Sequence, residues 1–287
     1  MYHLSQNLGQ RVAGTTGEIE ARNYIVQSFE RLGYQPEVQP FTYQRGNVVY
    51  DSANVAVVKE GKFKKELIIG AHYDAVRGVQ GVDDNATGIG VILEVAERIK
   101  DLNTPYTIRF IAFGAEEVGL KGSSAYAKKM KNKDINNTVA MINLDSLAVG
   151  DFKYVYGSSG KDGWLREFAL DIAEELSIDL QTNPGLNPEY PKGTTGDWSD
   201  HAPFNAIGIP YAYFEATNWE IGDLDGYTQT VKHGAIWHNP GKDNLAFIER
   251  DFPGRTKEHL RSFSHILTEL TLTLKQNTRA QYMSQLK

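Results

Sequence analysis

Short apolar runs alternate with helical repeats along most of the chain. Four runs are apolar almost throughout, as in strands buried on both faces of a sheet, and they lie at residues 67–71, 107–113, 139–144 and 210–214. Apolar positions at helical spacing follow them in turn, at residues 86–99, 121–130, 162–176 and 256–275. This alternation of strand and helix predicts a mainly parallel sheet with helices on both faces.

The first sixty residues add one helix and two strands to this pattern. Residues 16–32 predict an amphipathic helix, and residues 38–43 alternate as a strand whose proline favours a sheet edge. Residues 54–58 predict a further strand. We therefore expect an α/β fold with a mostly parallel mixed central sheet, in a single domain over residues 1–275. Residues 276–287 carry little apolar pattern, which predicts a C-terminal tail prone to fraying.

The composition limits the classes of function. With 30 basic and 36 acidic residues the net charge is −6, which argues against a nucleic-acid partner and favours cationic partners such as metal ions and peptide amines. There is no cysteine, so any metal must be held by His, Asp and Glu. The apolar runs are shorter than the ~20 residues that cross a bilayer, so we expect no membrane span. No signal peptide is visible at the start, and a cytoplasmic chain or a removed leader are both open.

Acidic residues and a histidine recur where the predicted strands end. Ligands of open α/β sheets bind beyond the carboxyl ends of the strands. The residues at these ends, and before the helix that follows the first strand, are His72 and Asp74, Asp83 and Asp84, Glu116 and Glu117, and Asp145. Each group alone has an ordinary explanation, for example a structural histidine, a helix N-cap, a solvated loop or a turn. One metal site accounts for all of them together.

Two zinc ions fit this set of donors. A catalytic zinc takes three protein ligands and leaves a position for water, so five residues suffice for two ions when one carboxylate bridges them. A further carboxylate must stay free to take a proton from the water, and the residues alone do not say which of Glu116 and Glu117 it is. Asp74 lies two residues from His72 and is expected to accept the second imidazole N–H.

Several motifs together resemble the signature of the bacterial leucyl-type zinc aminopeptidases. The motifs are Gly70-Ala71-His72-Tyr73-Asp74, Gly81 to Gly88, Ala115 to Ser123, Asn143-Leu144-Asp145, Ser199 to Phe204 and Ile236 to Pro240. They occur in the family's order over about residues 10–275. The resemblance implies the family's zinc-exopeptidase fold of the phosphorylase/hydrolase-like type.

The resemblance also implies a role for each site residue. His72 and Asp145 would bind one zinc, Glu117 and His238 the other, and Asp84 would bridge both. Glu116 would be the general base. Asp200 and His201 lie in a matching motif, where we expect them, like Asp74, to support the ligands.

The assignment of His238 as a zinc ligand depends most on the resemblance. His233 is only five residues from His238, but only His238 has the family's context of a following turn and an Asp. Some family members carry a Tyr just before this His to stabilise the oxyanion, whereas this chain has Trp237, which can only donate one N–H. Oxyanion stabilisation would then fall to the zincs or to another donor such as a loop tyrosine.

The implied function is removal of the N-terminal residue from peptides with a free N-terminus, in a secreted or extracytoplasmic enzyme. Three alternatives remain within reach of the pattern. A glutaminyl cyclase would use this fold with a single zinc, and a carboxypeptidase or dipeptidase would need cationic groups for the substrate carboxylate. A binding domain without catalysis, as in the transferrin receptor, would have lost ligands or base, and none of the six key positions is substituted.

Specificity is the least determined property. The stretches 181–200 and 215–242 are too long for simple connections and are candidate functional loops. Aromatic residues could line a pocket for the first side chain or belong to the core; they are Tyr211, Tyr213, Phe214 and Trp219. The acidic residues Glu215, Glu220, Asp223 and Asp225 would favour basic N-terminal residues, unless this loop is simply solvated.

Overall fold

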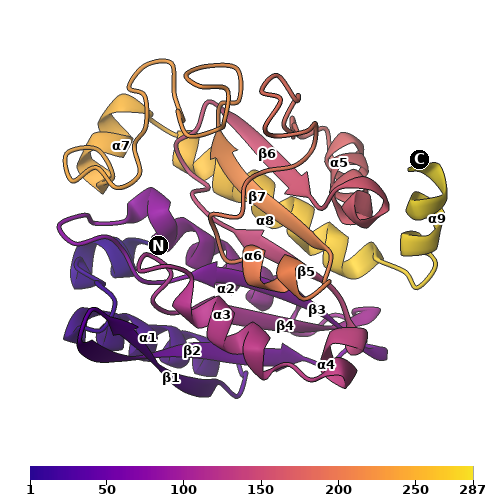
Figure 1. Cartoon of the computed structure of the whole chain (residues 1–287), viewed down its shortest axis with the longest axis horizontal. Helices are drawn as coiled ribbons and strands as arrows, with labels where there is room; N and C mark the ends of the chain where they lie inside the picture. The colour runs from indigo at the N-terminus through magenta and orange to yellow at the C-terminus, as the bar shows by residue number, and fades with distance from the viewer. Residues whose placement is uncertain (287) are drawn as a thin grey trace.

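One mixed sheet of seven strands forms the centre of the computed structural model, which describes residues 1–286 (Figure 1). The strands are β1 (Glu37–Arg45), β2 (Val48–Lys59), β3 (Phe63–His72), β4 (Tyr106–Phe113), β5 (Thr138–Leu144), β6 (Phe152–Gly157) and β7 (Tyr211–Thr217). Their order across the sheet is β1-β2-β4-β3-β5-β7-β6. The four central strands are parallel, whereas β1, β2 and β6 pair antiparallel. The carboxyl ends of four parallel strands therefore meet at one edge of the sheet.

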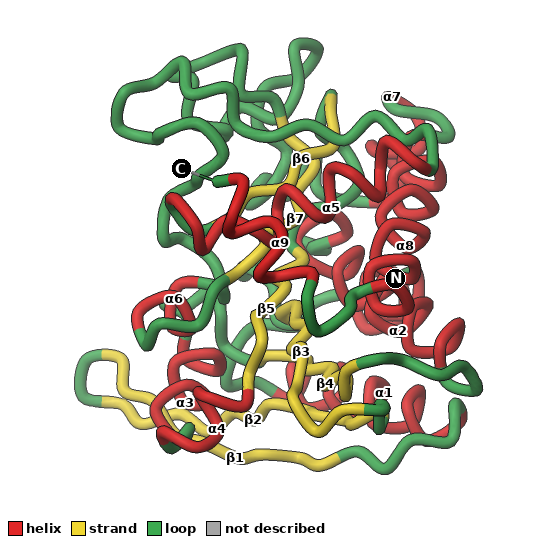
Figure 2. Tube along the Cα trace, turned by 90° about the vertical axis from the view of Figure 1, so that its right-hand side faces the viewer, coloured by secondary structure: helices red, strands yellow, loops and turns green. Residues whose placement is uncertain are grey.

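Helices cover both faces of this sheet (Figure 2). The face with the larger core carries α1 (Thr16–Arg31), α2 (Thr87–Ile99), α5 (Trp164–Glu175) and α8 (Arg255–Thr273). The other face carries the shorter helices α3 (Lys121–Lys129), α4 (Asn132–Asn137) and α6 (Ala202–Ala206). Two further helices are α7 (Leu245–Asp251) and α9 (Thr278–Gln285), and short helical turns span His3–Leu8, Val82–Ala86 and Gly160–Gly163.

Strand β3 shows why the apolar runs are uninterrupted. Side chains alternate between the two faces of a strand. Leu67 and Ile69 accordingly belong to the larger core, and Ile68 belongs to the smaller core on the opposite face. Because helices cover both faces, neither set of positions can be polar.

The predicted α/β fold, with a mostly parallel mixed sheet between two layers of helices, is confirmed. Strand β6 was not predicted, because its buried tyrosines pack in an aromatic cluster rather than in an aliphatic core. The expected tail contains α9, whose Tyr282 packs against Phe168 of α5 and donates a hydrogen bond to Asp171, and whose Met283 lies against the larger core. Within residues 1–286 no helix is long and apolar enough to cross a membrane.

Candidate metal centre

The carboxyl edge of the parallel strands brings together six side chains that the sequence singled out. His72 ends β3, Asp145 follows β5, and Glu116 and Glu117 follow β4. Asp84 lies in the turn before α2, and His238 in the long loop after β7. They form two overlapping groups of potential metal ligands, one of His72, Asp84 and Asp145 and the other of Asp84, Glu117 and His238.

In the first group His72 Nε2 lies 3.1 Å from Asp84 Oδ1 and 3.4 Å from Asp145 Oδ1. In the second, His238 Nε2 lies 3.1 Å from Asp84 Oδ2 and 3.0 Å from Glu117 Oε2. Asp84 thus presents one carboxylate oxygen to each group. His233, the alternative histidine, instead pairs with Asp251 at 2.9 Å.

These separations fit zinc. Two atoms that bind one tetrahedral zinc at about 2.0–2.1 Å lie about 3.3 Å apart, and the four measured separations are close to that value. The electrostatics also favour a cation, because the surrounding carboxylates are crowded. Burial lowers the pKa of His72, but Glu116 and Asp145 outweigh it and hold that pKa well above its usual value. The chain therefore attracts positive charge to the place where a metal would lie.

Glu116 belongs to neither group, yet it lies beside the first. Its Oε2 is 3.9 Å from His72 Nε2, and the residue is buried. Burial raises the pKa of Glu116 well above its usual value, and the carboxylates of Asp200 and Glu117 raise it further against the effect of His72. A carboxylate in this environment is suited to accept a proton.

Two carboxylates hold the backbone of the segment that carries the glutamates. Asp74 Oδ1 and Oδ2 accept hydrogen bonds from the amides of Glu116 (3.0 Å) and Glu117 (3.1 Å). Its Oδ1 also faces His72 Nδ1 at 3.6 Å, which is longer than a hydrogen bond. The preceding amide, of Ala115, donates to Glu18 Oε1 at 3.0 Å.

Glu18 was missed by the sequence analysis. It lies in the first turn of α1, is buried, and also accepts bonds from Gly14 N and Ser52 Oγ at 2.7 Å each. Ala115 itself has a positive φ of 55°, which a non-glycine residue adopts rarely. The local sequence gave no signal for Glu18, because an acid in the first helical turn is common for dipole reasons alone.

A second buried network positions Asp84 and the loop of His238. Asp243 accepts bonds from the amides of Asp83 (2.8 Å) and Asp84 (3.3 Å). Gln229 donates to Asp83 Oδ2 at 2.6 Å and accepts from the amides of Ile236 and Trp237. Asp243, the acid that follows His238 in the sequence motif, therefore supports both groups of ligands together with Asp83.

The residues of the Ser199 motif differ in their contacts. Ser199 Oγ donates to Asp145 Oδ2 at 2.7 Å. Asp200 is buried, and its carboxylate has no hydrogen-bond partner among the described residues; burial raises its pKa to about 7. His201 stacks on Tyr213 with 5.0 Å between ring centroids, and burial lowers its pKa to about 3, so it is neutral. Neither Asp200 nor His201 is in a ligand group.

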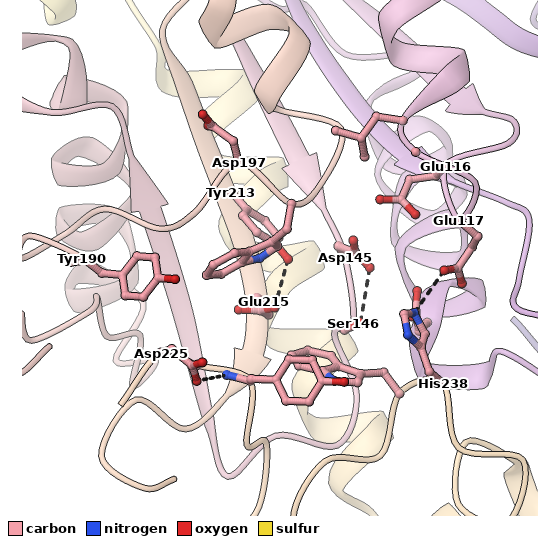
Figure 3. A pocket seen from close by; sticks show the side chains of 17 residues that line it. Glu116, Glu117, Asp145, Ser146, Tyr190, Asp197, Tyr213, Glu215, Asp225 and His238 are labelled. Atoms are coloured by element: carbon pink, nitrogen blue, oxygen red, sulfur yellow. Dashed lines mark hydrogen bonds and ion pairs between the residues drawn. The ribbon is translucent and has the colours of Figure 1, made fainter. Parts of the chain in front are cut away.

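A cavity of about 510 Å³ opens beside the ligands (Figure 3). Trp237 lines it next to His238, and its Nε1 has no hydrogen-bond partner within residues 1–286. The ring of Tyr227, in the same loop region, lies edge-on to Trp237 at 5.4 Å. The fold and these side chains together describe an α/β protein with a candidate metal centre open to a substrate-sized cavity.

Comparison with known proteins places the chain in a family. The sequence profile of peptidase family M28 matches residues 54–264. The alkaline phosphatase isozyme conversion protein of Escherichia coli (strain K12) is 35% identical over 95% of this chain and 88% of its own length. Aminopeptidase YwaD of Bacillus subtilis (strain 168) is 31% identical over 70% of this chain and 41% of its own length. The chain belongs to peptidase family M28, which makes it a peptide hydrolase.

Solved structures share its fold. BSAP, a zinc aminopeptidase from Bacillus subtilis, superposes with a TM-score of 0.76 at 21% identity, covering 93% of this chain and 91% of its own. A glutaminyl cyclase from Porphyromonas gingivalis superposes with a TM-score of 0.69 at 18% identity, covering 99% and 96%. The fold therefore accommodates both activities, and the side chains of the site must distinguish them.

Proposed function

We propose that the chain is a metallo-aminopeptidase that holds two zinc ions and removes the N-terminal residue of peptides with a free amino group. His72 and Asp145 would hold one ion, Glu117 and His238 would hold the other, and Asp84 would contribute one carboxylate oxygen to each. The single observation that carries this proposal is the position of Asp84, whose two oxygens lie 3.1 Å from His72 Nε2 and 3.1 Å from His238 Nε2.

Glu116 is the general base of this proposal. Two zinc ions held by these residues would lower the pKa of a shared water and polarise the scissile carbonyl. Glu116 takes the proton from the attacking water and returns it to the leaving amine, which requires a carboxylate that is free of metal and close to the ligands. Asp74 and Glu18 position this base through the amides of residues 115–117. Trp237 Nε1 and the hydroxyl of Tyr227 are the candidate donors to the oxyanion from the chain itself.

The alternative is a single-zinc glutaminyl cyclase, which the structural likeness to the Porphyromonas gingivalis enzyme raises. Two complete groups of three ligands favour the aminopeptidase. We also propose an extracytoplasmic location, supported by a relative described as a probable lipoprotein aminopeptidase of Mycobacterium tuberculosis. Cell fractionation tests the location.

The proposal is tested by Glu116→Gln with Glu97→Gln, an exposed acid in α2, as the matched control. Turnover of free-amino chromogenic amides should fall by about 10²–10⁴-fold in Glu116→Gln, while metal analysis still finds two zincs per chain. Near-normal turnover of Glu116→Gln would show that Glu116 is not the general base. One tightly bound zinc would support the cyclase, and hydrolysis of substrates with a blocked amino group would exclude an aminopeptidase.

A further inference from the structure

The cavity beside the metal centre has aromatic walls. Apart from the candidate ligands and base, its lining includes the aromatic residues Tyr190, Trp198, Tyr213, Tyr227 and Trp237. They come from β7 and from the two long loops. Tyr190 and Tyr213 lie on the side of the cavity away from Glu117 and His238 (Figure 3), whereas Trp237 directly precedes His238. Aromatic walls accept an apolar side chain, and they also accept a cation over a ring face.

Three carboxylates other than the candidate metal ligands and the candidate base line the same cavity. They are Asp197, Glu215 and Asp225. No Lys or Arg of the described residues is among its lining, and none of the three acids forms an ion pair within residues 1–286. Of the four acids singled out in the sequence, Glu215 and Asp225 face the cavity, whereas Glu220 and Asp223 do not line it. The wall of the cavity therefore carries three acidic side chains without a compensating cation from the described residues.

Glu215 is the most informative of the three. It lies in β7, is 1% exposed, and accepts hydrogen bonds from Tyr156 Oη (2.7 Å) and Tyr213 Oη (2.9 Å). Burial of a carboxylate is costly unless it is paired, and here burial raises the pKa of Glu215 to about 8 even though the two hydroxyl donors lower it. A carboxylate accepts about four hydrogen bonds, so Glu215 retains capacity for a further donor from the cavity.

We propose that this cavity binds the side chain of the substrate's N-terminal residue and selects a cationic one, arginine or lysine. Glu215 accepts a hydrogen bond from the cationic head at the buried end of the cavity, Asp197 and Asp225 add carboxylates nearer to solvent, and the aromatic rings contact the aliphatic stem and the cationic head. Arginine fits best, because its planar guanidinium both stacks on rings and donates to carboxylates in pairs. This inference rests on the proposed aminopeptidase function, because it assigns the substrate class of that same site.

The first experiment measures binding without turnover. The zinc-loaded protein is titrated calorimetrically with argininamide, lysinamide and leucinamide, which share the free amine and differ in the side chain. A charge-assisted contact predicts about tenfold tighter binding of argininamide than of leucinamide. Equal or tighter binding of leucinamide would overturn the inference, whether or not the protein hydrolyses peptides.

The second experiment assigns the selectivity to residues. We compare the ratio of kcat/KM for arginyl and leucyl amides in Glu215→Gln, in the double variant Asp197→Asn/Asp225→Asn, and in Asp223→Asn. Asp223 is the matched control, because it is an exposed acid of the same loop that does not line the cavity. The ratio should fall about tenfold in the first two and match the parent in Asp223→Asn. Equal ratios in all variants would refute selection by these carboxylates.

The outcomes separate this inference from the proposed function. If no amide is hydrolysed at all, the aminopeptidase proposal fails, while the titration still decides the side-chain preference. If Glu215→Gln weakens the binding of all three amides equally, Glu215 recognises the shared amine and selection of a cationic side chain by Glu215 is wrong.

Discussion

Replacing Glu18 by Gln tests how the candidate base is held in place. Three donors converge on this carboxylate: Gly14 N on Oε2, and Ser52 Oγ and Ala115 N on Oε1. Glutamine has nearly the same shape, but its amide nitrogen cannot accept a hydrogen bond. One of the two carboxylate positions therefore loses its acceptor, and two N–H groups face each other if the amide nitrogen replaces Oε2.

The size of the effect follows from these contacts. Loss of one buried hydrogen bond to a charged group costs about 2 kcal/mol. An unfolding entropy of about 2.1 cal/mol/K per residue amounts to about 0.6 kcal/mol/K for 287 residues, so Tm should fall by about 3 °C. The catalytic effect should be larger, because Ala115 directly precedes Glu116 and a small displacement of a catalytic group reduces kcat, here by about tenfold.

Differential scanning calorimetry and kcat for a free-amino amide measure the two effects. Burial raises the pKa of Glu18 to about 7, so the comparison belongs at about pH 8.5, where the carboxylate is ionised. Glu20→Gln, an exposed acid of the same helix, is the matched control. A lower Tm with unchanged kcat would refute the positioning role, and parent-like values of both would refute the energetic reasoning as well.

Two further predictions concern protons and metal. Burial lowers the pKa of His259 to about 4, so the unfolded chain binds a proton that the folded chain does not as pH falls below about 6.5, and stability is lost over pH 6.5 to 4. Between pH 7.5 and pH 5 the free energy of unfolding should fall by about 2 kcal/mol less in His259→Gln than in the parent. Denaturant unfolding at the two pH values measures this difference, and an identical pH dependence of the two proteins would contradict the prediction. Chelation at neutral pH should lower Tm by several degrees, because the carboxylates of Asp84, Glu117 and Asp145 are left facing one another, and added zinc should restore it. An unchanged Tm in the chelator would argue against a metal in this site.

The sequence predicted most of the fold because the central strands are buried on both faces. Residues 67–71 and 139–144 cannot be mistaken for half-exposed strands, and each is followed by a clear helical repeat. Elements at the periphery gave weaker signals. Strand β6 is rich in tyrosine, and α9 contributes only Tyr282 and Met283 to the apolar packing, so neither shows a strong period.

The candidate ligands were found for a related reason. Strand ends meet at one edge of a parallel sheet, so residues that follow each strand become neighbours. No such rule predicts which residues elsewhere in the chain support the ligands. Glu18 lies before the first strand and Gln229 lies in an irregular loop, and both reach the site only through tertiary packing. Nor does the order of residues show that Asp74, beside the imidazole of His72, also accepts hydrogen bonds from two backbone amides.

The shared position of Asp84 has a consequence for the connectivity of the chain. The ligand groups join segments from the N-terminal half of the chain with a loop near its C-terminal end. The hydrogen bond between Asp83 and Asp243 spans 160 positions. Closing so long a stretch of chain carries an entropic cost that short-range structure does not. The site is thus complete only after the loop of His238 has docked on the finished sheet. An ion held by Asp84, Glu117 and His238 would act as a removable cross-link between the two halves of the chain, and its affinity would report complete folding more faithfully than helix content does.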